Sequence, residues 1–192
     1  MRQNDMTECQ LHDVQCKLDE VVSQNNYLNP KVTDLEEKCK MMENALNEME
    51  QYSRRNCLRF MGVPETKDED TNAVIKSLAT TKLGVTIRDE YLDRSHRIGK
   101  LNKDGKPRII IAKFTRHDVR DQVIRSRRKL KGMKMAIQED LTAGYLGLLK
   151  KVEIHQKVKA VWTVDERIMA IVNNGQSESK MRIRSLGDLR KI

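Results

Sequence analysis

Residues 93–134, DRSHRIGKLNKDGKPRIIIAKFTRHDVRDQVIRSRRKLKGMK, hold the pattern on which the middle of this chain is built. The apolar run Ile109–Ala112 predicts a buried strand, and the polar segment Asn102–Pro107 before it predicts a turn. Between residues 94 and 134 there are 15 Lys and Arg side chains and three acids, a local net charge of +12 against +9 for the whole chain. Basic side chains often only keep a helix face solvated, but this density around one small sheet favours the binding of phosphates.

The flanking sequence completes a domain of strands and helices over residues 54–138. An alternating run that ends at Pro64 predicts a first strand, with Leu58 and Phe60 facing inward. The other predicted elements are a helix from Thr71 to Gly84, a strand over Tyr91–Ile98, a strand over Arg108–Thr115, a helix over about 117–130 and a strand near Met133–Ile137. The order βαββαβ is the ferredoxin-like arrangement of RNA-recognition motifs.

The outward side of this predicted sheet lacks the aromatic residues that usually stack on bases in such motifs. Its positions fall at Arg59 on the first strand and at Ile109, Ile111 and Lys113 on the third. We therefore expect that a nucleic acid would be held mainly through its phosphates, with little reading of its bases.

Residues 1–53 form a separate part of the chain. Residues 1–52 carry five basic and 11 acidic side chains, whereas residues 53–192 carry 32 and 17. Apolar residues recur in alternating steps of three and four, which predicts a coiled-coil helix. Position a holds Leu11, Leu18, Asn25, Val32, Cys39 and Leu46, and position d holds Val14, Val21, Leu28, Leu35, Met42 and Met49.

A narrow apolar stripe on a polar helix requires a partner, which is either this chain's own folded part or another copy of the chain. The length of the stripe favours self-association. Lys31 and Lys38 at position g face Glu36 and Glu43 at position e of a parallel neighbour, and Asn25 would fix the register. The a and d residues leave a dimer or a trimer open. Pro30 predicts a kink or a break near Asn29.

Residues 139–192 predict a small α+β domain. After the capping sequence 139–142, a helix places Leu146, Leu149 and Val152 on one side. Segments 160–164 and 167–172 predict a hairpin, 180–184 a further strand, and Ser185 the start of a short helix. Trp162 is expected in the core of the hairpin, with stacking on a base as the alternative.

Several function classes are excluded by what the sequence lacks. No GxxxxGK, HExxH or GxSxG motif is present, so we expect no enzyme. The four cysteines form no CxxC pair, which indicates a reducing compartment, and we expect neither a metal nor another cofactor. Apolar runs are too short for a membrane span and no signal peptide is visible, so a cytoplasmic or nuclear protein is expected.

Four segments in the first three quarters of the sequence resemble a known family. The segments QYSRRNCLRFMGVPE, DRSHRIGK, KPRIIIAKFTRHDVRDQVI and RSRRKLKG closely resemble the first open-reading-frame proteins of LINE-type retrotransposons. The resemblance implies a coiled coil, an RNA-recognition-like domain and a small C-terminal domain, in a protein that forms trimers, coats its own RNA and acts as a nucleic-acid chaperone. Residues 31–36 and 38–43 are similar to the trimer-favouring pattern of coiled coils, with Lys in place of Arg, so a homotrimer is preferred over a dimer.

The last part, LLKK…VWTVDERIMAIVNN…MRIRSLGDLRKI, resembles the C-terminal domain of baculovirus few-polyhedra proteins and insect retroelement proteins. Members often have Gly after the hairpin Asp, where this chain has Glu166. The resemblance leaves two alternatives to an RNA-coating protein. One is a structural or regulatory protein of the few-polyhedra kind, and the other is a relative of insect DNA-binding proteins that lacks their zinc finger.

The expected partners are single-stranded RNA or DNA and further copies of this chain. The charge pattern and the two resemblances together nominate 15 basic residues for nucleic-acid binding: Arg54, Arg55, Arg59, Arg94, Arg97, Lys113, Arg116, Arg120, Arg125, Arg127, Arg128, Lys129, Lys131, Lys150 and Lys151. The roles of Lys150 and Lys151 are implied by the resemblance to retroelement proteins alone.

Overall fold

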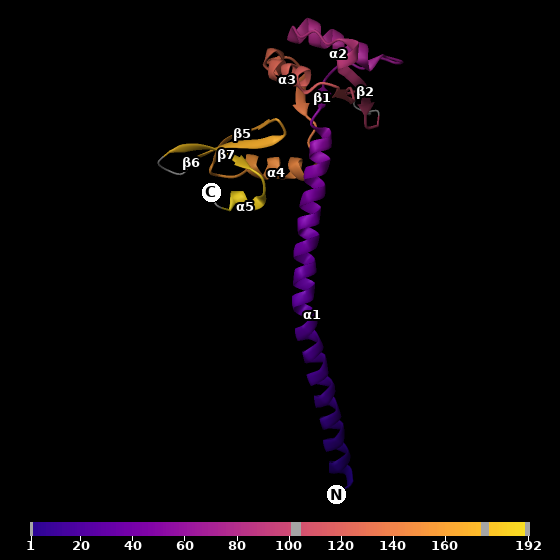
Figure 1. Ribbon diagram of the computed structural model, residues 1–192, viewed down its shortest axis with the longest axis vertical. Coiled ribbons are helices and arrows are strands. Elements are labelled where there is room, and N and C mark those ends of the chain that lie inside the picture. Colours follow the sequence, from indigo (N-terminus) through magenta and orange to yellow (C-terminus); the bar gives the residue numbers. More distant parts are fainter. Residues whose placement is uncertain (1, 101–104, 174–176, 191–192) are drawn as a thin grey trace. The chain divides into compact units, whose positions relative to one another are not determined.

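The computed structural model describes residues 2–100, 105–173 and 177–190, and the side chains from residue 10 onward (Figure 1). Two compact units divide the chain, Met1–Glu48 and Met49–Ile192. The elements are helices and antiparallel strands, which confirms the predicted α+β class. Each unit is described separately below.

Helix α1 runs from Arg2 to Arg54 and makes up the whole described part of the first unit. Of the kink or break predicted near Asn29, the break is wrong, since the backbone stays helical on both sides of Pro30. Proline lacks the N–H that would donate to the carbonyl four residues earlier, and the turns before and after it retain their hydrogen bonds. The hydroxyl of Thr33 donates to the carbonyl of Asn29 at 3.0 Å in the same turn.

The predicted heptad stripe lies along this helix without cover from the chain itself. All twelve residues at positions a and d, from Leu11 to Met49, are exposed. Lys38 pairs with Asp34 of the same helix at 2.7 Å, and the amine of Lys31 contacts the Tyr27 hydroxyl. A row of large apolar side chains of this length is unusual on the surface of a protein that acts as a monomer.

The second unit contains a four-stranded antiparallel sheet in the order β2-β3-β1-β4. Its elements follow the predicted sequence of strands and helices, with ends that differ by a few residues. They are β1 (Cys57–Met61), α2 (Thr71–Leu78) continued by the π-helical turn η1 (Ala79–Leu83), the 3₁₀ turn η2 (Asp89–Tyr91), β2 (Leu92–Ile98), β3 (Ile109–Phe114), α3 (His117–Ser126) continued by the 3₁₀ turn η3 (Arg127–Leu130), and β4 (Ala136–Glu139).

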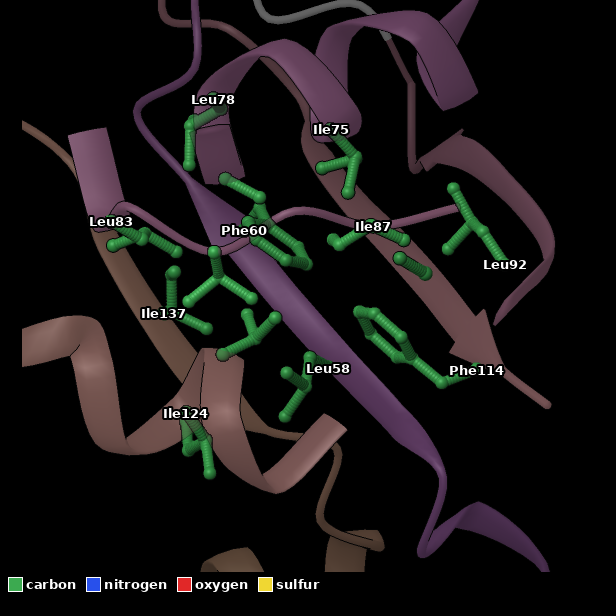
Figure 2. Packing of buried hydrophobic residues seen from close by; sticks show 14 of the residues in the cluster. Leu58, Phe60, Ile75, Leu78, Leu83, Ile87, Leu92, Phe114, Ile124 and Ile137 are labelled. Atoms are coloured by element: carbon green, nitrogen blue, oxygen red, sulfur yellow. The ribbon is translucent and has the colours of Figure 1, made fainter. Parts of the chain in front are cut away.

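One face of this sheet carries the core (Figure 2). Leu58 and Phe60 of β1 are fully buried, as predicted, and they pack with Phe114 of β3 against Ile75 of α2 and Ile124 of α3. Asp70 caps α2 by accepting from the N–H groups of Asn72 and Ala73. Strand alternation leaves Arg59, Ile111 and Lys113 on the opposite face, as predicted, where they are partly or largely exposed.

The remainder of the second unit has its own sheet and core. Its elements are α4 (Ala143–Glu153), β5 (Val158–Val164), β6 (Arg167–Asn173), β7 (Glu178–Ile183) and α5 (Leu186–Leu189), with strand order β5-β6-β7. Val152 of α4 packs with Ile168, Ala170 and Val172 of β6, and Thr142 and Ser185 cap the two helices. The predicted helix, hairpin, third strand and final helix are confirmed.

Trp162 departs from its predicted place. Its partner across the ladder is Met169, and the neighbours of Met169 along β6, Ile168 and Ala170, point into the core. Because side chains alternate along a strand, Trp162 lies on the face away from the core and remains partly exposed. The expectation that it belongs to the hairpin core is therefore wrong.

Candidate nucleic-acid interface

The last turn of α1 is joined to the segment that links the two sheets. The buried amide of Gln51 donates to the carbonyl of Asp140 at 3.1 Å and accepts from the N–H of Thr142 at 2.8 Å. Asp140 in turn pairs with Arg59 at 2.5 Å and with Arg54 at 3.5 Å. These contacts hold Arg54 and Arg59 close together, each partly exposed and sharing one carboxylate.

Two of the nominated basic residues have buried side chains that pair with buried acids. The side chain of Arg97 is only 4% exposed, pairs with Glu69 and also donates to three backbone carbonyls. The side chain of Arg120 is 1% exposed and donates to the equally buried Glu139 at 2.8 Å. Their nomination as nucleic-acid contacts is corrected, because a buried charge of this kind is held by its partner. The Arg97 guanidinium also lowers the pKa of Glu69 through their hydrogen bonds.

A second group of nominated residues is exposed but already paired with a nearby acid. Arg116 donates to Asp118 at 2.7 Å and holds the pKa of that carboxyl below its usual value. Arg125 pairs with Asp121 at 2.8 Å and Lys113 with Asp93 at 3.3 Å. Ion pairs at the surface contribute little to stability because water screens them, so a phosphate could replace these acids.

Six of the remaining nominated cations are free to bind an anion. Within the part of the chain that the structure describes, no hydrogen bond or ion pair is made by the side chains of Arg94 on β2, Arg127 and Arg128 in η3, Lys131 after it, or Lys150 and Lys151 on α4. Of the last two nominated residues, Lys129 donates to the carbonyl of Leu83 at 2.5 Å and Arg55 to the Tyr52 hydroxyl at 2.7 Å.

The densest group of these cations comes from the tight turn of η3. A 3₁₀ turn contains about three residues, so consecutive side chains fan out around one short segment. Leu130 at its end is buried in the core and fixes the turn. Arg127, Arg128 and Lys131 are thereby concentrated at one place, where Asp121 is the nearest acid along α3 and is already paired.

A cleft of about 440 Å³ lies between α3, η3 and the end of β5. It is lined by Asp121, Ile124, Arg125, Arg127, Arg128, Glu139, Trp162, Thr163, Val164 and Asp165. Trp162 and Arg127 also line an adjoining cleft of about 330 Å³ beside α4. Tertiary contact therefore brings Trp162 to the basic turn, although they are more than 30 positions apart in the sequence. The alternation of β5 and β6 was the sequence signal that could have placed Trp162 on the outward face.

A group of acids lies beside this cleft, in the turn between β5 and β6. The N–H of Glu166 donates to the Glu139 carboxylate at 3.2 Å, and Asp165 contacts His117 at 3.0 Å. Burial, with help from the nearby Glu139 and Asp165 charges, raises the pKa of Glu166 to about 7, against the lowering effect of Arg120. The buried Arg120 guanidinium therefore lies near two carboxyl groups, Glu139 and Glu166, and does not fully neutralise both.

No protein-family model matches this chain. Among the described residues, no group of three or more His, Cys, Asp and Glu side chains could hold a metal ion. No helix in the described ranges has the length and apolar character needed to cross a membrane.

Proposed function

We propose that this protein binds single-stranded RNA or DNA mainly through phosphate contacts, and that it does so as a parallel oligomer joined by α1. The observation that carries the proposal is the group of cations at η3, Arg127, Arg128 and Lys131, which have no acidic partner among the described residues. Clustered basic side chains that are not neutralised internally attract the phosphate backbone.

The arrangement of the four-stranded sheet also supports this proposal. The order β2-β3-β1-β4 with two crossing helices fits the ferredoxin-like arrangement of RNA-recognition motifs. The outward positions of β1 and β3 hold Arg59, Ile109, Ile111 and Lys113, so this face offers charge and aliphatic surface, with no ring among these four residues. Binding through phosphates is the mode that such a face favours.

The exposed stripe on α1 supports self-association. Its apolar residues could be buried by the same stripe of a second and third copy, with Lys31 and Lys38 next to acidic residues of the neighbouring helix. The similarity to retrotransposon LINE proteins favours a homotrimer that coats RNA and acts as a chaperone. An oligomer would place several basic units along one strand.

The test compares binding of labelled 40-nucleotide RNA, matched single-stranded DNA and duplex DNA at several salt concentrations. The triple variant Arg127→Ala, Arg128→Ala, Lys131→Ala should weaken binding to all single strands about equally and reduce the salt slope by roughly 0.7 for each phosphate that is no longer neutralised. A control is Lys82→Ala with Arg88→Ala, which removes one cation from η1 and one from the residue before η2. Unchanged binding by the triple variant would contradict the proposed site.

A further inference from the structure

Trp162 is the one tryptophan of the chain and lies outside the C-terminal core. The ladder places it opposite Met169, and Met169 lies opposite Arg182 of β7. The ammonium of Lys180, also on β7, is 5.3 Å from the centroid of the indole ring. The ring is therefore held on the outer surface of a sheet whose neighbouring side chains are basic.

The cleft beside the ring has the size of a ligand site. Its volume of about 440 Å³ falls in the range of roughly 300–1,000 Å³ that small-molecule sites occupy. One wall is β5, with Trp162 and Thr163, and the other is η3, with Arg127 and Arg128. One aromatic residue and two arginines thus line the same space.

Two arginines of the cleft, Arg127 and Arg128, have no acidic partner among the described residues. Each of the three acids that line it has a basic or histidine partner: Asp121 pairs with Arg125, Asp165 with His117 and Glu139 with Arg120. Arg127 is partly buried, and its side chain makes no hydrogen bond or ion pair within the described residues. A partly buried guanidinium without an internal partner is suited to an external anion, because its desolvation would otherwise be uncompensated.

We propose that this cleft holds one unpaired base of a single-stranded nucleic acid, stacked on Trp162, while Arg127 and Arg128 bind the adjoining phosphates. The inference rests on the proposed function and extends it, because it adds one base contact for each copy of the chain to an otherwise phosphate-bound strand. Every base has an aromatic face, so the contact tolerates all four bases and requires only that the base be unpaired.

The experiment uses the fluorescence of the unmodified full chain, in which Trp162 is the one tryptophan. The protein is titrated with a 15-nucleotide dT strand and with an abasic strand of the same length, which keeps the phosphates but has no bases. Binding of both strands is also followed through a label on the strand. The dT strand should quench Trp162 and bind about tenfold more tightly, since stacking of one base contributes roughly 1–3 kcal/mol.

Four variants distinguish the contribution of the Trp162 ring from that of the arginine charges. Trp162→Leu should lower the affinity for dT to nearly that for the abasic strand and leave the abasic affinity unchanged, whereas Trp162→Phe should retain part of the difference. Arg127→Ala should weaken both strands by a similar factor, and Arg88→Ala should weaken neither.

The outcomes distinguish this inference from the proposed function. Equal affinities for the two strands with no quenching would refute the stacked base and leave phosphate binding intact. Absence of binding to either strand would refute both. Preferential binding of duplex over single strands, with no quenching, would also refute the inference, because a paired base cannot enter the cleft.

Discussion

Replacement of Glu166 by Gln should stabilise the second unit at alkaline pH and leave its stability unchanged in acid. Glu166 follows Asp165 in the turn between β5 and β6, and its carboxyl group is half-buried beside Glu139 and Arg120. Its pKa is about 7 in the folded chain and near 4.5 when exposed, so the folded state binds its proton more tightly than the unfolded state does.

The direction of the pH dependence follows from these two values. Below about pH 4.5 the carboxyl is protonated in both states, so it carries no penalty. As the pH rises from 4.5 to 7, the unfolded chain ionises first and stability is lost; above 7 the full penalty applies. At about 1.4 kcal/mol for each pH unit, the shift corresponds to roughly 3 kcal/mol, which solvent screening of a half-exposed group reduces to about 1–2 kcal/mol.

The assay is urea unfolding followed by Trp162 fluorescence, because Trp162 lies on β5, the strand that leads into the turn. The free energy of unfolding is measured for both proteins between pH 4.5 and pH 8. Glu166→Gln should gain about 1–2 kcal/mol at pH 8 and nothing at pH 4.5. The control Glu153→Gln removes a carboxylate from the exposed end of α4 and should show no such trend. A gain that is independent of pH, or a loss at pH 8, would refute the reasoning.

Four further predictions concern the coil, the buried ion pair and the turn. Oxidation should link two chains through Cys39, because position a meets position a in a parallel coiled coil. Cys39→Ser should abolish the covalent dimer on a non-reducing gel. Cys16→Ser, which changes an outward position, should retain it. Leu28→Asp with Leu35→Asp should convert the trimer or dimer to a monomer in equilibrium sedimentation. The same variant should lose at least tenfold affinity for a strand of about 50 nucleotides, because avidity requires several linked units. Its affinity for a strand of about 10 nucleotides should change little. Arg120→Met should lower the free energy of unfolding in urea by about 3–5 kcal/mol, because it leaves Glu139 buried without its partner. The double variant with Glu139→Leu should recover much of that stability. Equal losses of stability in the two variants would contradict the pairing. Glu166→Gly should raise the midpoint of urea unfolding even at pH 4.5, since φ is +62° at this residue and a non-glycine side chain is strained there, whereas Glu166→Ala should not.

The elements of this chain follow from local patterns. Alternation placed Leu58 and Phe60 in the core and Arg59 outside it, and the capping residues Asp70 and Ser185 mark the helix starts that the structure contains. Heptad spacing predicted the long helix α1, though Pro30 suggested a kink or a break, and the helix has no break. Such patterns suffice because they depend on backbone geometry and on neighbours one to four residues away.

The use of the buried charges depends on contacts that the local sequence does not contain. Arg97, Arg120 and Arg127 occupy one basic region, yet Arg97 pairs with a residue 28 positions away, Arg120 with one 19 positions away, and Arg127 with none in the described chain. The approach of Trp162 to η3 and of Glu166 to Glu139 likewise arises where β5 and its turn meet α3 and β4. Hydrophobic periodicity sets which face of an element is buried. The partner of a buried charge is set instead by the packing of distant elements. Only that packing distinguishes the interior arginines from those left free to bind phosphate.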